Sequence, residues 1–262
     1  MKFSGKIPCA LTMAGSDSGA GAGVQADMLT FAANGVYATS AIAALTAQNP
    51  NGISAIEPVS PEVFEAQIKA VFSFYAPRAA KTGMLFNAQL IETAANALKG
   101  QKCTLVADPV MISTSGAKLL RDDAVEALTA KLLPEAALIT PNLDEAEFIL
   151  GEEITNMDSA ARSLSKKFGT SVLLKGGHLP GTEIIDVLAV RGGPTRTWKS
   201  RRVDGVNTHG SGCTLSAAIT AFLALGNGLE RAVERARNYI LAGMENPVRV
   251  GSGSFINHFP SR

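Results

Sequence analysis

Cysteine and histidine are both scarce in this sequence, and their spacing excludes several kinds of site. Only three of the 262 residues are cysteines, Cys9, Cys103 and Cys213, and they lie far apart in the chain. An odd number of cysteines without a C-x-x-C pair matches neither a disulfide framework nor a cysteine-ligated metal site, and it favours a reducing compartment. The histidines are equally dispersed and give little support for a zinc site: His178, His209 and His258.

Charge of one sign is lacking as well. The formal net charge is +1 and there is no long run of like charges, so nothing indicates binding to nucleic acid or to an acidic membrane surface. Five basic residues lie between Arg191 and Arg202 without an acidic one. Their alternation with polar and aromatic side chains predicts a solvated strand face.

Long apolar runs are missing too. No run approaches the roughly 18 residues of a membrane span, and the start, MKFSGKIPCALTMAG, lacks a convincing secretory core. We therefore expect a cytoplasmic protein whose partners are small molecules.

What the chain does contain is an alternation of short apolar runs with longer helical patterns. Strands are expected at 7–15, 37–48, 79–85, 104–110, 136–141, 171–177 and 184–190, with an antiparallel position open for the last. Helices are expected at 23–35, 60–76, 87–100, 122–133, 142–150, 158–168, 212–225 and 229–244. This alternation requires crossover connections and predicts an α/β fold, a mostly parallel sheet with helices on both faces, in one domain over residues 1–262.

Polar residues follow several of the expected strands, and ligands gather at the carboxyl ends of strands in such sheets. Asp108 precedes Pro109, Asn142 and Glu145 lie in TPNLDE, and Lys175 precedes two glycines. Each has a structural explanation: a turn opener, a capping box and a solvated cation. The glycines of AGSDSGAGAGVQAD could serve only to let the first helix pack closely.

Two carboxylates, a lysine and two glycine-rich helix starts on one rim are, however, the components of an Mg²⁺–nucleotide site. No G-x-x-x-x-G-K-[ST] or G-x-G-x-x-G pattern occurs in the chain. The sequence therefore favours a kinase that does not use a P-loop.

The second glycine-rich start is VNTHGSGCTLSAAI. Gly210 and Gly212 free the backbone around Ser211, and Cys213 falls in the first turn of the expected helix. Backbone N–H groups there favour an anion, and the same position favours a thiolate. Negative charge from a nearby nucleotide would oppose that, so the net direction of the Cys213 pKa is left open. The structural alternative is a capped buried helix with Cys213 as a small core residue.

Taken in order, these motifs resemble those of the ribokinase-like kinases, and within them the hydroxymethylpyrimidine and phosphomethylpyrimidine kinases of thiamine biosynthesis. The resemblance covers essentially the whole chain: AGSDSGAGAGVQAD, TAQN, KTGML, ADPVM, TPNLDEAE, LLKGGH and THGSGCTLSAAI. The superfamily motif D-T-x-G-A-G-D ends in aspartate, whereas this chain has Cys213 at the base position, as in the pyrimidine-kinase branch and some pyridoxal kinases.

The resemblance implies a three-layer fold, a homodimer, and ATP-dependent phosphorylation, with Mg²⁺, of 4-amino-5-hydroxymethyl-2-methylpyrimidine and then of its monophosphate. It implies that Gln48 binds the aminopyrimidine edge, while five other residues line or support its pocket: Gly15, Ala22, Asp27, Met84 and Val110. Asp108, Asn142 and Glu145 would serve Mg²⁺–ATP, the two carboxylates as metal ligands directly or through water. Lys175 would reach the phosphates, Gly210, Ser211 and Gly212 would form an anion hole, and Cys213 would act as base or position the hydroxyl.

Three rival interpretations remain open at this point. A pyridoxal or pyridoxine kinase of the same fold has a similar flat hydroxymethyl substrate. A non-catalytic nucleotide-binding protein would not need Asp108, Glu145, Lys175 and Cys213 together. A flavodoxin-like or Rossmann oxidoreductase is disfavoured by the missing glycine fingerprint.

Overall fold

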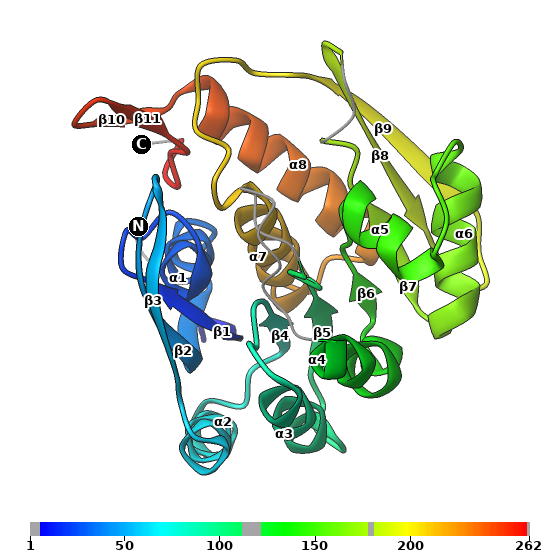
Figure 1. Cartoon of the computed structure of the whole chain (residues 1–262). Helices are drawn as coiled ribbons and strands as arrows, with labels where there is room; N and C mark the ends of the chain where they lie inside the picture. Colours follow the sequence, from blue (N-terminus) through cyan, green and yellow to red (C-terminus); the bar gives the residue numbers. More distant parts are fainter. Residues whose placement is uncertain (1–5, 112–121, 178–180, 261–262) are drawn as a thin grey trace.

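A computed structural model of the chain describes residues 6–111, 122–177 and 181–260, and Figure 1 shows a sheet enclosed by two groups of helices. Among the described residues nine strands form one sheet, in the order β3-β2-β1-β4-β5-β6-β7-β8-β9. Their bounds are β1 Cys9–Asp17, β2 Tyr37–Asn49, β3 Gly52–Pro58, β4 Ala79–Thr82, β5 Thr104–Ala107, β6 Leu138–Ile139, β7 Ser171–Leu174, β8 Glu183–Ala189 and β9 Thr195–Arg201.

The six strands from β2 to β7 in this order pair in parallel, whereas β3, β8 and β9 pair antiparallel at the two edges. The predicted mostly parallel sheet is therefore confirmed, and the open position of 184–190 is resolved as antiparallel. Parallel strands have their carboxyl ends on one rim, so residues that follow β1, β4, β5, β6 and β7 come together there.

Helices cover both faces of the sheet, as predicted (Figure 1). One group packs on the large core cluster: α2 Pro61–Tyr75, α3 Ala88–Leu98, α4 Asp122–Ala127, the π-helix η1 Leu128–Leu132, α5 Leu143–Leu150 and α6 Met157–Phe168. The other group covers the opposite face: α1 Gly23–Ala33, α7 Ser211–Ala224 and α8 Leu229–Glu245. A short 3-10 turn, η2 Leu133–Glu135, follows η1.

Helix α7 is the most buried of these helices, and its sequence explains why. Ala217 and Ala221 pack with Ala10 of β1 and Phe31 of α1, while Ile219 and Phe222 join Leu138 and Leu173 of the sheet in a second cluster. Small side chains let the helix approach the strands closely, and the larger ones fill the space toward α8. The amino end of α7 is thereby held at the carboxyl rim of the sheet.

Local signals place most helix ends where the sequence predicts them. The Ser60 side chain caps α2 and Pro61 is its first residue. Asn142 and Glu145 form the expected capping box of α5, in which each side chain accepts the other residue's backbone N–H.

The structure also contains elements that were not predicted. Strand β3 is mostly exposed, and a small hairpin near the carboxyl end, β10 Val248–Val250 and β11 Gly253–Phe255, is partly exposed. These segments lack the buried alternation by which a strand is recognised. The helix expected at 122–133 is divided, because Pro134 cannot continue an α-helix and its last turns widen into η1. In the described part of the chain no helix is long and apolar enough to cross a bilayer.

Candidate active site

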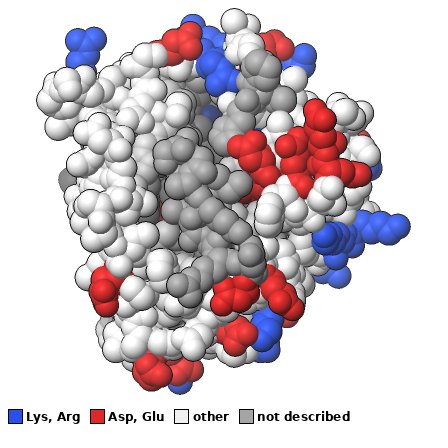
Figure 2. Space-filling view, in the orientation of Figure 1, with Lys and Arg blue, Asp and Glu red and all other residues white. Residues whose placement is uncertain are grey.

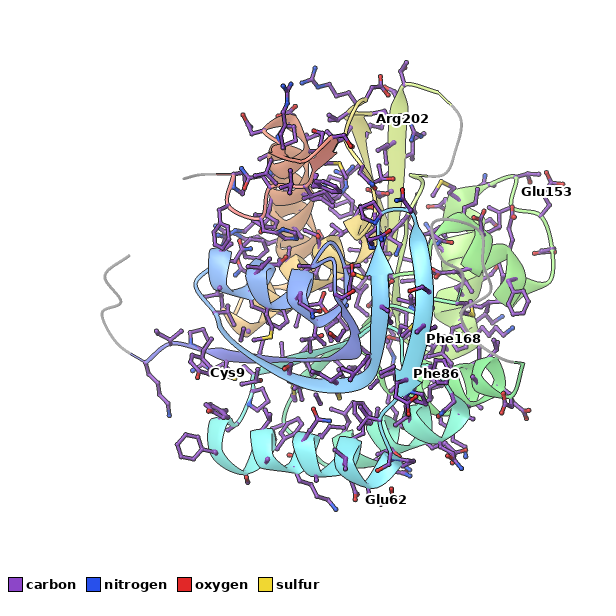
Figure 3. All side chains as sticks on the ribbon, turned by 60° about the vertical axis from the view of Figure 1, so that its left-hand side comes forward. Cys9, Glu62, Phe86, Glu153, Phe168 and Arg202 are labelled. Carbon is purple, nitrogen blue, oxygen red and sulfur yellow. The ribbon has the colours of Figure 1, made fainter. Side chains whose placement is uncertain are left out.

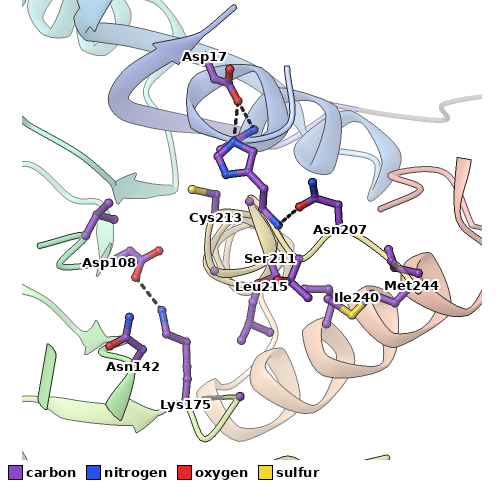
Figure 4. Close-up of a pocket in the computed structure, with 18 of the residues that line it drawn as sticks. Asp17, Asp108, Asn142, Lys175, Asn207, Ser211, Cys213, Leu215, Ile240 and Met244 are labelled. Carbon is purple, nitrogen blue, oxygen red and sulfur yellow. Dashed lines mark hydrogen bonds and ion pairs between the residues drawn. The ribbon is translucent and has the colours of Figure 1, made fainter. Parts of the chain in front are cut away.

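A cavity of about 730 Å³ lies along the carboxyl rim of the sheet and over the amino end of α7. Thirteen of the fourteen residues proposed from the sequence line it: Gly15, Ala22, Gln48, Met84, Asp108, Val110, Asn142, Glu145, Lys175, Gly210, Ser211, Gly212 and Cys213. In Figure 4, Asp17, Cys213, Asp108 and Lys175 surround the α7 start, and the cavity continues toward Ile240 and Met244 of α8. One cavity thus joins an end formed by the first strands to an end formed by the last ones.

Asp27 is the exception, since it supports the cavity without lining it. Its side chain is fully buried, accepts a hydrogen bond from Thr12 Oγ1 at 2.6 Å and pairs with Lys81 Nζ at 2.9 Å. Its Oδ1 atom has no partner among the described residues. Lys81 was not predicted as a site component, because a lysine within a strand is usually exposed.

The two glycine-rich segments contact each other directly. Gly210 has a φ of +79°, and a Cβ at this position would lie 1.8 Å from the carbonyl oxygen of Gly21. Gly23 has a φ of +61°, and its Cβ would lie 2.4 Å from the Gly15 carbonyl. The glycines therefore do what close packing of the first helix requires, and they also bring the two loops together at the cavity.

Asp108 and Lys175 form the charged centre of the site. Lys175 Nζ donates to Asp108 Oδ1 at 3.0 Å, and the same carboxylate accepts from Thr140 and Ser216 (Figure 4). Burial alone would raise the pKa of Asp108, but the charges of Lys175 and Lys81 outweigh it and hold that pKa below its ordinary value. Burial would lower the pKa of Lys175, but Asp108 and Glu145 keep it raised. Both groups are charged at neutral pH.

The backbone around Lys175 explains why two glycines follow it. The Lys175 N–H donates to the Pro141 carbonyl at 2.9 Å, which sets Lys175 beside Asn142. A Cβ on Gly176 would lie 2.0 Å from the Ile185 carbonyl of β8, so only glycine fits where the chain passes that strand. Lys175 is thus fixed by the sheet on both sides.

Glu145 is held by its capping role. Its Oε1 accepts from the Met111 N–H at 3.1 Å and its Oε2 from the Asn142 N–H at 2.9 Å. Burial raises the pKa of Glu145, although Lys175 partly offsets this. No group of three or more potential metal-ligating His, Cys, Asp or Glu side chains occurs in the described ranges.

Cys213 does not have the lowered pKa that a helix start alone would favour. Burial raises the pKa of its thiol to about 11, and the nearby charge of Lys81 only partly lowers it. At neutral pH the group is a thiol, not a thiolate. The direction of the Cys213 pKa shift, which was left open from the sequence, is upward because desolvation outweighs the effect of the helix terminus.

One backbone N–H of the predicted anion hole already has a partner within the chain. The Ser211 N–H already donates to the Thr208 carbonyl at 3.0 Å. The glycine-rich turn around Gly212 stays a predicted phosphate site. A Cβ on Gly212 would lie 3.3 Å from Lys175 Nζ, so this turn and the lysine face the same space.

Val110 shows that the wall of the cavity is strained. Its φ is +43°, which is rare for a β-branched residue and costs on the order of 1–3 kcal/mol. Such a conformation persists where the surroundings determine it, and Val110 lies between Asp108 and the Met111 N–H that Glu145 holds.

Two residues at the other end of the cavity, Asp17 and His209, were not proposed from the sequence. His209 Nε2 lies 3.0 Å from Asp17 Oδ2 and 3.0 Å from Gln48 Nε2. Asp17 is the last residue of β1 and His209 lies within THGSGC, so the rim rule and the glycine motif could have identified both.

Fold and site together define the class of the protein, a ribokinase-like kinase of small molecules. A family model described as phosphomethylpyrimidine kinase matches residues 17–258. The hydroxymethylpyrimidine/phosphomethylpyrimidine kinase of Haemophilus influenzae is 44% identical over 250 residues, which is 93% of each chain. A bifunctional thiamine biosynthesis protein of Geobacter sulfurreducens is 42% identical over 95% of this chain and 51% of its own.

Solved structures agree with these matches. The phosphomethylpyrimidine kinase of Clostridium difficile superposes with a TM-score of 0.81 at 44% identity, covering 90% of this chain and 98% of the other. The pyridoxal kinase of Bacillus subtilis superposes with a TM-score of 0.87 at 33% identity, covering 97% and 98%. The chain belongs to the phosphomethylpyrimidine kinase family.

Proposed function

We propose that the chain transfers the γ-phosphate of ATP first to the hydroxymethyl group of 4-amino-5-hydroxymethyl-2-methylpyrimidine and then to the resulting monophosphate. The observation that carries this is the single cavity in which Gln48 and Met84 at one end meet Lys175 and Asp108 at the other. A substrate with a flat polar ring and a phosphoryl acceptor fits between a hydrogen-bonding amide and a cationic phosphate site.

The ring end is shaped by small residues. A Cβ on Gly15 would lie 2.6 Å from Met84 Cε, so glycine lets the methionine lie against β1. Ala22 and Val110 add apolar surface to the same cavity. Gln48 supplies both a donor and an acceptor, as an aminopyrimidine edge requires.

At the donor end, Lys175 and the turn at Gly212 neutralise negative charge on the transferred group. A bond forms between the acceptor oxygen and the γ-phosphorus, and the bond from that phosphorus to the bridging oxygen breaks, leaving ADP. In the first reaction the acceptor hydroxyl also loses its proton, which is released to water as the phosphate ester forms. The monophosphate acceptor of the second is already ionised near neutral pH.

Mg²⁺ fits this site as part of a metal–nucleotide complex. Mg²⁺ keeps several waters and uses one or two carboxylates together with substrate phosphates. Asp108 and Glu145 lie at the right rim, but their oxygens already accept hydrogen bonds, so they would hold the ion chiefly through its waters. When bound, the ion would neutralise phosphate charge.

The experiment is a coupled assay of ADP formation with three acceptors: the pyrimidine alcohol, its monophosphate and pyridoxal. We expect turnover with both pyrimidines and much less with pyridoxal. The likeness to a pyridoxal kinase favours pyridoxal as the second candidate acceptor. A kcat/KM for pyridoxal above that for the pyrimidine alcohol would replace the proposed function with pyridoxal kinase activity.

We also propose that the chain forms a homodimer through the outer surface of β2 and β3. The residues of β3 are mostly exposed, and Leu45 of β2 is 52% exposed. The pair of strands lies in front of the rest of the sheet in Figure 3. An edge of this kind favours a second chain as its cover.

A further inference from the structure

The ring end of the cavity contains a chain of polar contacts that the proposed function does not yet use. His209 Nε2 lies 3.0 Å from both Asp17 Oδ2 and Gln48 Nε2. Thr46 Oγ1 lies 3.1 Å from Gln48 Oε1 and also donates to the Ser16 carbonyl at 2.8 Å. Two side chains, His209 and Thr46, therefore contact the Gln48 amide, and Asp17 contacts the first of them.

The histidine ring is held in place independently of Gln48. A Cβ on Gly21 would lie 2.9 Å from His209 Cδ2, so the ring packs against that glycine. The backbone N–H of His209 donates to Asn207 Oδ1 at 2.8 Å (Figure 4). The position of Nε2 is consequently set before any substrate binds.

The proton on His209 Nε2 is fixed by Asp17. The Asp17 side chain is 4% exposed and accepts from the Gly19 and Ala22 N–H groups. Burial would raise the pKa of Asp17, but the hydrogen bonds from His209 and the two backbone groups lower it, so it is a carboxylate. A carboxylate oxygen 3.0 Å away requires a proton on Nε2, because a lone pair there would face negative charge.

A protonated Nε2 cannot also accept from the Gln48 amide nitrogen. Turning the amide by 180° places Oε1 toward the His209 N–H and Nε2 toward Thr46. Thr46 Oγ1 has only one proton, which goes to the Ser16 carbonyl, so it can accept from the turned amide nitrogen. In this orientation the single His209 Nε2 proton is shared between Asp17 Oδ2 and the turned Gln48 oxygen, and one N–H of the turned amide faces Thr46 Oγ1.

We propose that His209, held by Asp17, is a positioning residue that fixes the direction of the Gln48 amide and thereby determines which ring the cavity selects. This proposal rests on the proposed function, in which Gln48 binds the ring edge. A fixed amide offers its remaining donor and acceptor in one order, which one ring edge matches and the edge of another ring does not. A freely turning amide would accept either order.

The test is a double-mutant cycle of His209→Ala and Gln48→Ala, assayed with the pyrimidine alcohol, pyridoxal and ATP. We expect His209→Ala to raise KM for the pyrimidine alcohol about tenfold and to leave KM for ATP within about twofold, since one oriented hydrogen bond is lost. The preference for the alcohol over pyridoxal should fall by a similar factor. The double variant should be no worse than Gln48→Ala alone.

His209→Gln is the conservative control, because its amide N–H reaches about as far as Nε2 and can donate to Asp17. It should recover most of the preference. If the increases in KM of the two single variants multiply in the double variant, His209 acts independently of Gln48 and the proposal is overturned. If KM for ATP rises as much as KM for the alcohol, the role of His209 is purely structural and the proposal is likewise overturned. If the wild-type protein phosphorylates only pyridoxal, the proposed function fails, and the same cycle measured with pyridoxal still decides whether His209 acts through Gln48.

Discussion

Cys213 lies in the first turn of α7, where a helix start favours a thiolate and burial opposes it. The raised pKa of about 11 shows that burial prevails. A neutral thiol can orient a hydroxyl group but cannot accept its proton at neutral pH. Since phosphoryl transfer passes through a loose transition state, early proton removal is not required.

We predict that Cys213→Ala lowers kcat/KM for the pyrimidine alcohol about tenfold and for the monophosphate less. The alcohol loses an orienting contact, whereas loss of a general base would cost about 10²–10⁴. Steady-state rates with both acceptors measure this.

The pH dependence provides the second measurement. Below the pKa of a thiol, the fraction present as thiolate rises about tenfold per pH unit. If Cys213 were the base, the wild-type rate with the alcohol would therefore rise from about pH 7 to about pH 9, and the rate of the variant would not change with pH. We expect the two profiles to run parallel. A wild-type slope that the variant lacks would restore Cys213 as the base.

Some of the individual site residues could be predicted from the sequence and others could not. Asp108, Asn142 and Lys175 were found because each follows a buried strand, and the rim rule needs only strand ends. Lys81 was missed because its ion pair with Asp27 joins residues 54 apart in a buried contact. Neither a strand pattern nor a helix pattern shows which distant residue will neutralise a charge.

At the scale of elements, the contact between the two glycine segments decides whether the site forms. Gly210 has both a positive φ and the Gly21 carbonyl at the place of a side chain. Gly226 has a similar φ of +85° but nothing within 4 Å of its would-be Cβ. Comparing Gly210 with Gly226 therefore distinguishes the effect of backbone strain from the effect of close contact with another segment.

We predict that Gly210→Ala destabilises the protein by about 3 kcal/mol or more and abolishes most activity, because strain and overlap with Gly21 add. Gly226→Ala should cost only about 1 kcal/mol from strain and keep its activity. Urea unfolding measures the stability of the two variants, and steady-state assays without urea measure their activity. Equal losses of stability would mean that the Gly21 contact carries no energy.

Helices and strands were predicted correctly where one face, or the whole element, is buried. Ser60 and Asn142 marked helix starts by their capping chemistry. Strand β3 escaped because its exposed residues carry no periodic apolar signal, and it is a strand only because β2 pairs with it. Pairing with a neighbour is a property of the folded sheet, which a local pattern does not contain.

At the scale of the whole molecule, the surface gives no large field of one sign on the face seen in Figure 2, where basic and acidic side chains both occur. Its exposed apolar residues include Leu45 on β2 and an aromatic group in which Tyr75 of α2 contacts both Phe74 and Tyr37. The dimer proposed above uses the first and not the second.

We predict that Leu45→Glu converts the dimer to a monomer of about 27.2 kDa, whereas Phe74→Glu leaves the dimer intact. A buried glutamate at an interface is costly, and one on an open helix face is not. Light scattering after size-exclusion chromatography gives the masses, and circular dichroism checks the fold. Dissociation by Phe74→Glu alone would move the interface to α2.

Helix α7 joins the centre of the sheet although it comes late in the chain. It packs against α1 and β1, and its first turn forms one wall of the cavity. While the ribosome is still making the residues before Ser211, the surface around Ala10 and Ala79 lacks the part of its cover that α7 supplies, although Phe31 of α1 already packs there. A nascent or truncated chain that lacks α7 would leave this apolar strip exposed and favour its binding by chaperones, so catalysis has to wait for this late helix.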